Sequence, residues 1–415
     1  MESTFQSSER LSFRQVLNSY VNYLMSQYRS IPYIVEKLDH IYDDEKNALI
    51  QFIIDKGLQS VSPSEIGTAI AKLSIPCENI EEYDVYYTGI QNIVNVSQNF
   101  ISTQFVDCIT QFDNYLRNLM RCIYRLHPEI LKNSNKSISY KELLDITTID
   151  NAKDFVIESV LTELFHGSHS EQLEHFSKIT KIDVPKQMEE LYKQLIEITE
   201  RRNIHIHCHG KASKQYINVC LQNKVAVTVS EGDDLKIDKT YFLESIDALM
   251  ELSVKIGFIV WKKQEKAEHE NADKFLIALC NDLIRQGRNK LAIALIDYVI
   301  DNKDNQMSLF NKHLLKMYWI CAQKRDGNNT EYEKGIHEDW TSVKPLISLI
   351  LSVLEDDYAS AIEQMKHIGN DPKELDKTIF EDSVLFSEYV KQREFKDAYK
   401  SIFSADFCYS RMAVQ

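Results

Sequence analysis

The sequence contains few residues that interrupt helices. Its 415 residues include 11 Gly and 7 Pro, well below average usage. Leu, Ile, Lys, Glu and Gln are frequent instead, and these side chains favour long helices joined by short connections. We therefore predict an all-α fold in which β-strands are a minority.

Closely spaced cysteines and an excess of basic charge are also missing. The eight Cys lie far apart, without a CxxC pair or zinc-finger spacing, so we expect reduced thiols and no structural zinc. The formal net charge of −14 argues against a broad basic surface that coats nucleic acid. Any contact with nucleic acid would therefore be local.

Targeting and membrane segments are not evident in the sequence. Residues 1–15 lack a basic region followed by an apolar run, and no apolar run in the chain approaches the length that spans a bilayer. Together with the unpaired cysteines, this leads us to expect a cytoplasmic protein without a membrane partner.

Changes in composition divide the chain into three expected parts. Residues 1–87 form an N-terminal segment of several helices, one of which should begin at the capping sequence SPSE, residues 62–65. Residues 88–265 form a central helical domain, and residues 270–415 form a C-terminal domain. The charged stretch 262–274 has almost no apolar side chains, so the domain boundary is expected there.

The C-terminal domain carries a loose repeat. Three helical stretches place a small side chain where a neighbouring helix could approach closely, at Ala292, Ala361 and Ala398. Their separations of 69 and 37 residues are near two periods and one period of a helix-turn-helix repeat of about 34 residues. The pattern indicates either a degenerate tetratricopeptide-like array, which could bind a protein or peptide, or an irregular helical bundle.

Apolar periodicity in the central domain indicates helices interrupted by one extended insert. A long apolar helix should cover about 88–132, and a helical pair broken near Gly167 should cover 150–180. After Gly210, the sequence KVAVTVSEGDDLKID alternates apolar and polar residues around a Gly-Asp turn, which predicts a small β-hairpin or an extended insert. Helix should resume at Asp238.

The sequence ERRNIHIHCHG, residues 200–210, concentrates groups that could do chemistry. One interpretation is a metal site, because His205, His207 and His209 would share one face of a strand, and the first and last would share one face of a helix. The stretch lacks the acidic residue between histidines that HExxH zinc sites have, which disfavours this interpretation.

A second interpretation is that these residues only end a helix. Basic side chains and histidines stabilise a helix C-terminus, and Gly210 stands where a left-handed cap is needed. Arg202 does not fit, because it continues the apolar face that Leu191, Leu195 and Ile198 form. A guanidinium on that face should meet a ligand, a carboxylate or another subunit, since burying it alone is costly.

The third interpretation is catalytic. Asn203 and His207 lie four residues apart, so on a helix the amide can orient the imidazole, and the guanidinium of Arg202 reaches the same space. An arginine beside a neutral histidine suits metal-free cleavage of RNA, because the imidazole moves a proton while the guanidinium stabilises the phosphate as the ribose 2′-OH attacks. One histidine cannot easily serve as both base and acid, so two copies meeting at a dimer axis would complete the site.

The sequence RRNIHIHCHG resembles the signature of HEPN domains, a family named for higher eukaryote and prokaryote nucleotide-binding proteins. Its ribonuclease members carry Arg, a polar residue, a few residues and then His, which matches Arg202, Asn203 and His207. The likeness extends over about 95–265, with an amphipathic opening helix and the closing segment GDDLKIDKTYFLESIDALMEL. It implies an antiparallel helical bundle, a homodimer that apposes the two motifs, and RNA cleavage without metal or cofactor, in defence against phage or in toxin systems.

Carried over to this chain, the resemblance assigns the scissile phosphate to Arg202, acid or base catalysis to His207, and orientation of the imidazole to Asn203. Further residues have open roles. Candidates for support are Asp113 and Tyr216; candidates for RNA contacts, or else solvated bystanders, are Lys211, Lys214, His205 and His209. His205 and His209 depart from the family's pattern, and we interpret both as bystanders.

Two functions remain open at this point. The first is a metal-independent RNA endonuclease of the abortive-infection type, whose C-terminal domain senses a trigger or binds a partner. The second is a non-catalytic interaction protein, in which the HEPN-like bundle only dimerises and the C-terminal helices bind a protein or peptide. The Arg, Asn and His together favour the nuclease, whereas the acidic surface favours the interaction protein.

Overall fold

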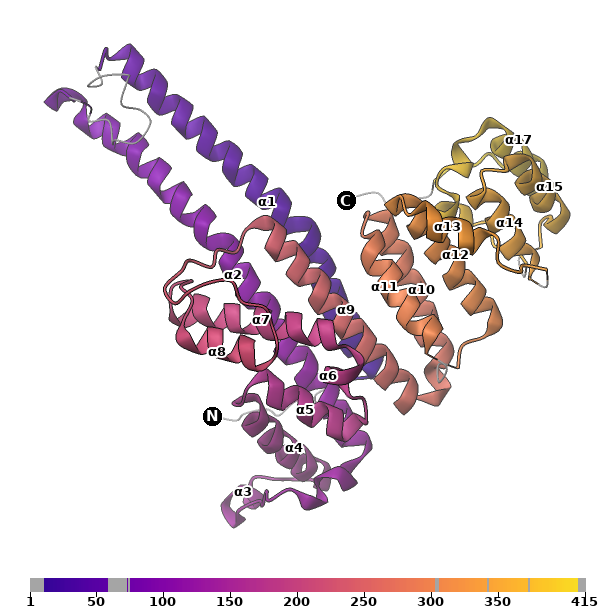
Figure 1. Ribbon diagram of the computed structural model, residues 1–415, viewed down its shortest axis with the longest axis horizontal. Coiled ribbons are helices and arrows are strands. Elements are labelled where there is room, and N and C mark those ends of the chain that lie inside the picture. Colours follow the sequence, from indigo (N-terminus) through magenta and orange to yellow (C-terminus); the bar gives the residue numbers. More distant parts are fainter. Residues whose placement is uncertain are drawn as a thin grey trace. The chain divides into compact units, whose positions relative to one another are not determined.

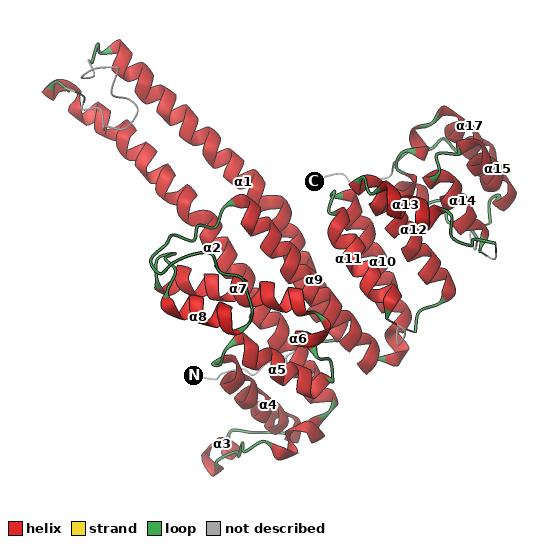
Figure 2. Cartoon of the chain, in the orientation of Figure 1, coloured by secondary structure: helices red, strands yellow, loops and turns green. Residues whose placement is uncertain are grey.

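Figures 1 and 2 show the computed structural model of the chain, which describes residues 11–58, 73, 75–302, 306–341, 343–371 and 374–409. All the named secondary-structure elements of these residues are helices, so the predicted all-α fold is confirmed. Residue contacts divide the chain into two compact units, Met1–Ser253 and Val254–Gln415. The division falls inside helix α9 (Lys239–Gln264), ahead of the charged stretch 262–274 where the boundary was expected.

Two long antiparallel helices form the framework of the first unit. α1 spans Phe13–Asp55 and α2 spans Ile80–Leu126, and Figure 1 shows them side by side. Ser12 caps α1, with its hydroxyl accepting a hydrogen bond from the Gln15 amide at 3.2 Å. Several helices were expected in the N-terminal segment, and residues 13–55 form one continuous helix, which runs through Pro32. The predicted capping sequence at 62–65 lies outside the described residues.

The core of the first unit forms around the C-terminal half of α2. Tyr20 of α1 packs there: its ring stacks on Tyr115 with 5.1 Å between centroids, and its hydroxyl donates to the Cys108 carbonyl at 3.2 Å. Six of the seven apolar positions that predicted this helix are buried, namely Phe105, Ile109, Phe112, Leu116, Leu119 and Ile123, whereas the seventh, Leu126, is 49% exposed. The helix ends at Leu126, earlier than the predicted end near residue 132, and Pro128–Asn133 form the short 3₁₀ helix η3 instead.

Shorter helices complete the first unit. They are η2 (Cys77–Asn79), η3 (Pro128–Asn133), α3 (Tyr140–Leu144), α4 (Ile149–Phe165), α5 (His169–Thr180), α6 (Val184–Gln187), α7 (Glu189–His207) and α8 (Lys214–Gln222). The predicted break near Gly167 is confirmed, because α4 ends two residues before it and the Ser168 hydroxyl caps α5 by accepting from the Glu171 amide.

Of the two predictions for residues 224–238, the β-hairpin is wrong, because these described residues form no strand pair with one another. The segment runs extended and pairs instead with the residues after α7, through one antiparallel bridge between Lys211 and Asp234. The valines that produced the alternating pattern pack on a small core cluster of Ile204, Ala212, Tyr216, Cys220 and Leu235. The alternation therefore marks one buried face of a single extended segment.

The second unit is a series of packed helices. They are η4 (Lys266–Glu268), α10 (His269–Arg285), α11 (Asn289–Asp301), α12 (Leu309–Asp326), α13 (Asn329–Ile336), α14 (Pro345–Leu354), α15 (Tyr358–Ile368), α16 (Ile379–Asp382), η5 (Val384–Phe386), η6 (Tyr389–Lys391) and α17 (Arg393–Phe403). Neighbouring pairs in contact include α11 with α12 and α14 with α15. Ala292, Ala361 and Ala398 lie buried on α11, α15 and α17, as expected for positions of close helix approach.

The charged stretch 262–274 belongs to this packing. Lys262 near the end of α9 and Asp273 on α10 are both buried, and the Nζ–Oδ1 distance between them is 2.7 Å. Asp273 also accepts from the Asn311 amide at 3.4 Å. A stretch that reads as a solvated linker thus contains a buried ion pair, because composition does not reveal which charges find partners.

Candidate functional site

α7 carries the motif at its C-terminal end. Leu191, Leu195 and Ile198 bury its apolar face, as predicted. After the C-cap residue Cys208, both His209 (φ +51°) and Gly210 (φ +77°) are left-handed, and the Gly210 amide donates to the Ile204 carbonyl at 3.1 Å, so the predicted left-handed conformation of Gly210 is confirmed. A Cβ at this position would also lie 3.1 Å from the ring of His205, which is a second reason for glycine.

Arg201, the first of the two adjacent arginines, contacts an acidic and an aromatic side chain of the same unit. Nε of Arg201 donates to Glu197 at 2.7 Å, and the guanidinium lies 3.9 Å from the ring centroid of Tyr241. The same carboxylate accepts from the hydroxyls of Tyr216, at 2.8 Å, and of Tyr241. Burial, then the neighbouring Glu197, raises the pKa of the Tyr216 hydroxyl. Tyr216, a candidate for support, therefore anchors α8 to α7.

Arg202, the second arginine, has fewer partners than Arg201. Arg202 is half-buried, and its Nη1 donates to the side-chain oxygen of Asn203 at 3.1 Å. Its Nε is buried without a hydrogen-bond partner among the described residues, and no carboxylate there forms an ion pair with it. Asn203 in turn donates to Glu200 at 3.3 Å. The Arg202 guanidinium is thus not neutralised by a carboxylate of the described residues.

The three histidines have different surroundings. His207 is exposed as the last residue of α7, and His209 is exposed with φ +51°. His205 is half-buried, and its Nε2 donates to the Leu235 carbonyl at 2.8 Å. Burial lowers the pKa of His205, so its imidazole is neutral at pH 7 and ties the loop to the helix. Among the residues that the structure describes, no group of three His, Cys, Asp or Glu side chains could hold a metal ion.

The two candidate lysines lie on the exposed side of the helix end. Lys211 follows Gly210, and its Nζ is 3.4 Å from an oxygen of Asp234, a pairing between two largely exposed side chains. Lys214 begins α8, whose N-terminus is capped by the Ser213 hydroxyl accepting from the Tyr216 amide at 3.1 Å. Both ammonium groups therefore remain accessible to solvent near the motif.

Asp113 has a partner that the sequence does not reveal. Its Oδ1 lies 2.8 Å from Nε2 of His169, the first residue of α5. Burial raises the pKa of the Glu200 carboxyl, against the opposing effects of the Asn203 hydrogen bond and of His169. Asp113 is thus paired with His169, while Glu200, Asn203 and Arg202 are joined by hydrogen bonds along α7. Sequence analysis missed His169, since no local pattern connects α2 to α5, and it assigned no role to Glu200.

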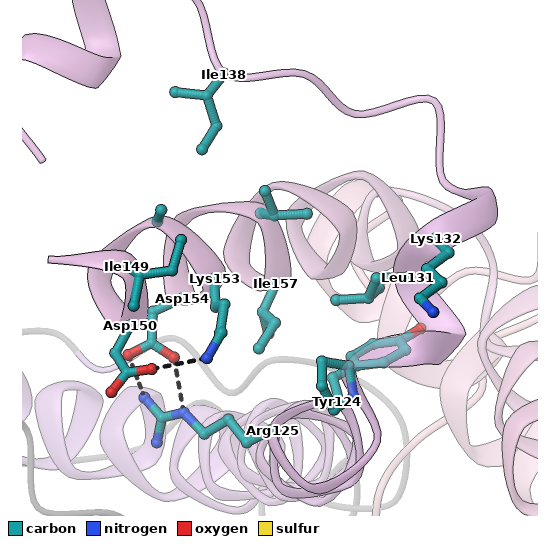
Figure 3. A pocket seen from close by; sticks show the side chains of 13 residues that line it. Tyr124, Arg125, Leu131, Lys132, Ile138, Ile149, Asp150, Lys153, Asp154 and Ile157 are labelled. Atoms are coloured by element: carbon teal, nitrogen blue, oxygen red, sulfur yellow. Dashed lines mark hydrogen bonds and ion pairs between the residues drawn. The ribbon is translucent and has the colours of Figure 1, made fainter.

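A cavity of about 610 Å³ lies apart from the motif, lined by residues of α2, η3, α4 and the loop after η3 (Figure 3). Aliphatic side chains cover much of its wall. Arg125 pairs with Asp154 at 2.8 Å and Lys153 pairs with Asp150 at 2.9 Å, so these charges are already compensated. A second cavity, of about 420 Å³, is lined in part by Glu197, which lies about 120° around α7 from Asn203 by helical phase.

The fold and site define an all-α protein of two compact units, with an Arg-Asn-His helix end in the first. No family model matches the chain, and no solved structure matches it. The chain is similar to SWI5-dependent HO expression protein 4 of Saccharomyces cerevisiae, with 24% identity over 249 residues. This match covers 55% of the chain and 30% of the yeast protein, so the chain spans less than a third of that relative. Among the described residues, no helix is long and apolar enough to cross a membrane.

Proposed function

We propose that the chain is a metal-independent endoribonuclease of HEPN type, with a composite active site at the interface of a homodimer. The observation that carries the proposal is the contrast between Arg201 and Arg202. Arg201 is neutralised by Glu197, whereas Arg202 has no carboxylate partner among the described residues. In a protein of net charge −14, an arginine kept away from carboxylates suits a phosphate ligand.

The proposed reaction needs only groups of the chain and of RNA. Arg202 binds the scissile phosphate and stabilises its charge. His207 removes the 2′-OH proton, the oxygen attacks phosphorus, and the bond to the 5′-oxygen breaks. The partner subunit's His207 donates a proton to the leaving oxygen, so the products carry a 2′,3′-cyclic phosphate and a 5′-hydroxyl. Asn203 orients the imidazole one turn along α7, and Lys211 and Lys214 hold neighbouring phosphates.

The second unit has a separate role in this proposal. Its buried alanines on α11, α15 and α17 are compatible with a tetratricopeptide-like region that binds a protein or peptide. We place the protein in the cytoplasm, where a ribonuclease of the abortive-infection or toxin type would meet its RNA substrate.

The test uses the full chain, total RNA and excess chelator. Wild-type protein should produce fragments with cyclic phosphate ends, and Arg202→Ala and His207→Ala should abolish them. His209→Ala is the matched control, because it removes an exposed histidine two residues from His207, and it should cleave like wild type. Intact RNA with dimeric wild-type protein contradicts the nuclease proposal. Cleavage by both variants contradicts the assignment of these residues.

The second candidate function is a non-catalytic dimeric interaction protein. The acidic net charge favours it, because RNA is repelled by such a surface outside the immediate motif. Spin labels on Ile206→Cys, an exposed position beside His207, would measure how far apart the two motifs lie in a dimer, once the accessible native thiols of Cys77, Cys208 and Cys408 are replaced by serine. A short distance supports the composite site, whereas a long distance with normal dimerisation supports the interaction protein.

A further inference from the structure

The outer parts of α1 and α2 pack as an antiparallel two-stranded coiled coil, called here the outer hairpin (residues 31–58 and 75–101). Buried and half-buried side chains recur at alternating steps of four and three residues along both helices. They are Ile31, Val35, Leu38, Tyr42, Glu45, Leu49 and Phe52 on α1, and Tyr83, Tyr86, Ile90, Ile93, Ser97 and Phe100 on α2. The rings of Phe52 and Tyr86 meet across this seam with 5.5 Å between centroids, and Figure 1 shows the two helices side by side.

A second apolar series on α2 lies beside the seam. Ile80, Tyr87, Val94 and Ile101 follow one another at seven-residue intervals, so they lie along one face of the helix. Ile80 is 40% exposed and Tyr87 is 47% exposed, while Val94 and Ile101 are half-buried. The ring of Tyr87 stacks on that of the seam residue Tyr83 with 5.9 Å between centroids. These four residues, the α2 apolar stripe, therefore extend the seam outward on one side.

Exposed apolar side chains are concentrated on the outer hairpin. Among the residues that the structure describes, 20 large apolar side chains are exposed, and nine of them lie here, in 55 of the chain's 415 residues. They are Tyr33, Ile34, Ile41, Ile50, Ile54, Ile80, Val85, Tyr87 and Val96. Such a concentration marks a surface that another molecule covers. Because the stripe repeats every seven residues, a helix is the partner that matches its spacing.

The charge of the outer hairpin indicates the chemistry of that partner. Its two ranges contain ten Asp and Glu against three Lys, a net charge of −7, which is half of the chain's −14. Asp84 is exposed and adjoins the stripe, since it lies four residues after Ile80 and three before Tyr87. A second copy of the chain would bring the same negative charge to this surface and be repelled. A helix with basic side chains beside its apolar face is complementary to it.

We propose that the α2 apolar stripe binds a basic amphipathic helix of another protein, which packs along the outer hairpin as a third strand of the coiled coil. Its apolar side chains cover Ile80, Tyr87 and Val94, and its Lys or Arg side chains pair with Asp84 and the neighbouring carboxylates. This surface takes no part in RNA cleavage, so the inference goes beyond the proposed function and does not depend on it.

The experiment measures binding of a fluorescein-labelled synthetic peptide to the full-length protein by fluorescence anisotropy. The peptide has four heptads, about 28 residues, with Ile or Leu at the two seam positions and Lys at the two flanking positions. One control peptide has the same composition in scrambled order, and a second has Glu in place of each Lys. Circular dichroism establishes that each protein variant is folded.

We expect the basic heptad peptide to bind in the micromolar range, and both control peptides to bind at least about tenfold more weakly. Tyr87→Ser should raise Kd about tenfold by removing a large apolar contact. Tyr140→Ser is the matched control, because it removes a tyrosine that is 77% exposed on α3, and it should leave Kd unchanged. Asp84→Asn should raise Kd about threefold, and this difference should shrink in about 0.5 M NaCl.

Three results overturn the inference. The first is that the heptad peptide fails to bind the folded protein. The second is that either control peptide binds equally well, because that result reports attraction without a matching helix or without matching charge. The third is self-association of the wild-type protein that Tyr87→Ser abolishes in sedimentation, which assigns the stripe to a second copy of the chain.

Discussion

Replacing Glu197 with alanine should destabilise the first unit, because one carboxylate ties α7 to both α8 and α9. The Glu197 carboxylate accepts hydrogen bonds from Nε of Arg201 at 2.7 Å, from the hydroxyl of Tyr216 at 2.8 Å and from the hydroxyl of Tyr241. The substitution leaves a guanidinium and two hydroxyls without their acceptor. Glu197→Gln preserves the shape and one acceptor oxygen but removes the charge, so it should be milder.

The magnitude follows from how little water reaches these groups. The side chains of Arg201 and Glu197 are 15% and 17% exposed, so solvent screens the pair only slightly. Breaking a buried ion pair by removing one partner costs about 3–5 kcal/mol, and because the three donors share one acceptor, their losses do not add. We therefore expect a loss of about 3–5 kcal/mol for Glu197→Ala. For Glu197→Gln, which weakens charge-assisted hydrogen bonds, we expect about 1.5–3 kcal/mol.

The assay exploits the position of the tryptophans. All 3 Trp, at 261, 319 and 340, lie in the second unit, so fluorescence follows that unit while circular dichroism follows both. Glu197→Ala should lower the urea midpoint for unfolding of the first unit. This change should be visible by circular dichroism, whereas the fluorescence transition of the second unit should stay in place. Glu190→Ala, an exposed glutamate on the same helix, is the matched control and should have little effect. A loss below about 1 kcal/mol for Glu197→Ala would refute the reasoning that the pair is desolvated.

Three further predictions concern other parts of the molecule. Asp273→Ala should cost about 3–5 kcal/mol by leaving the ammonium of Lys262 buried, whereas the double variant Lys262→Met with Asp273→Leu should recover most of that loss in the fluorescence transition. Gly210→Ala should cost about 1–3 kcal/mol in urea unfolding, because φ is +77° and the new Cβ would press on His205; an unchanged midpoint would contradict both causes. Burial raises the pKa of Tyr298 from 10.0 to about 12, so the folded protein keeps this proton when the unfolded chain loses it. Stability should therefore hold below pH 10 and fall between pH 10 and 12, and Tyr298→Phe should reduce that fall measured by urea unfolding.

The helices were predictable because burial imposes a period on the sequence. Phe105, Phe112 and Leu116 mark one face of α2, and the structure buries that face as expected. The hairpin was not predictable, because Val225 and Val227 alternate in the same way whether their segment pairs with a second strand or packs alone on a core cluster. Local patterns report which side of a segment is buried, and they do not report what covers it.

The site was predictable to a similar extent. The helical phase of Arg202 and Asn203 is local information, and the structure joins these two side chains by a hydrogen bond. The contact between Asp113 and His169 joins residues 56 positions apart on different helices, and nothing in the spacing of the sequence indicates it. RNA cleavage, dimerisation and the binding role of the C-terminal helices stay predictions until the experiments above are done.

Because the side chains of α1 are buried unevenly, one part of this helix should unfold locally more easily than the rest. The helix is about 65 Å long at 1.5 Å per residue, yet its buried side chains lie mainly between Phe13 and Leu24. Beyond Ile31, Phe52 is its one buried side chain among the described residues, and Pro32 removes a backbone hydrogen bond where burial becomes sparse. Amide hydrogens should therefore exchange quickly in the outer part of α1 and slowly near Tyr20. The outer helical pair can then open and close while the core beneath the motif stays folded.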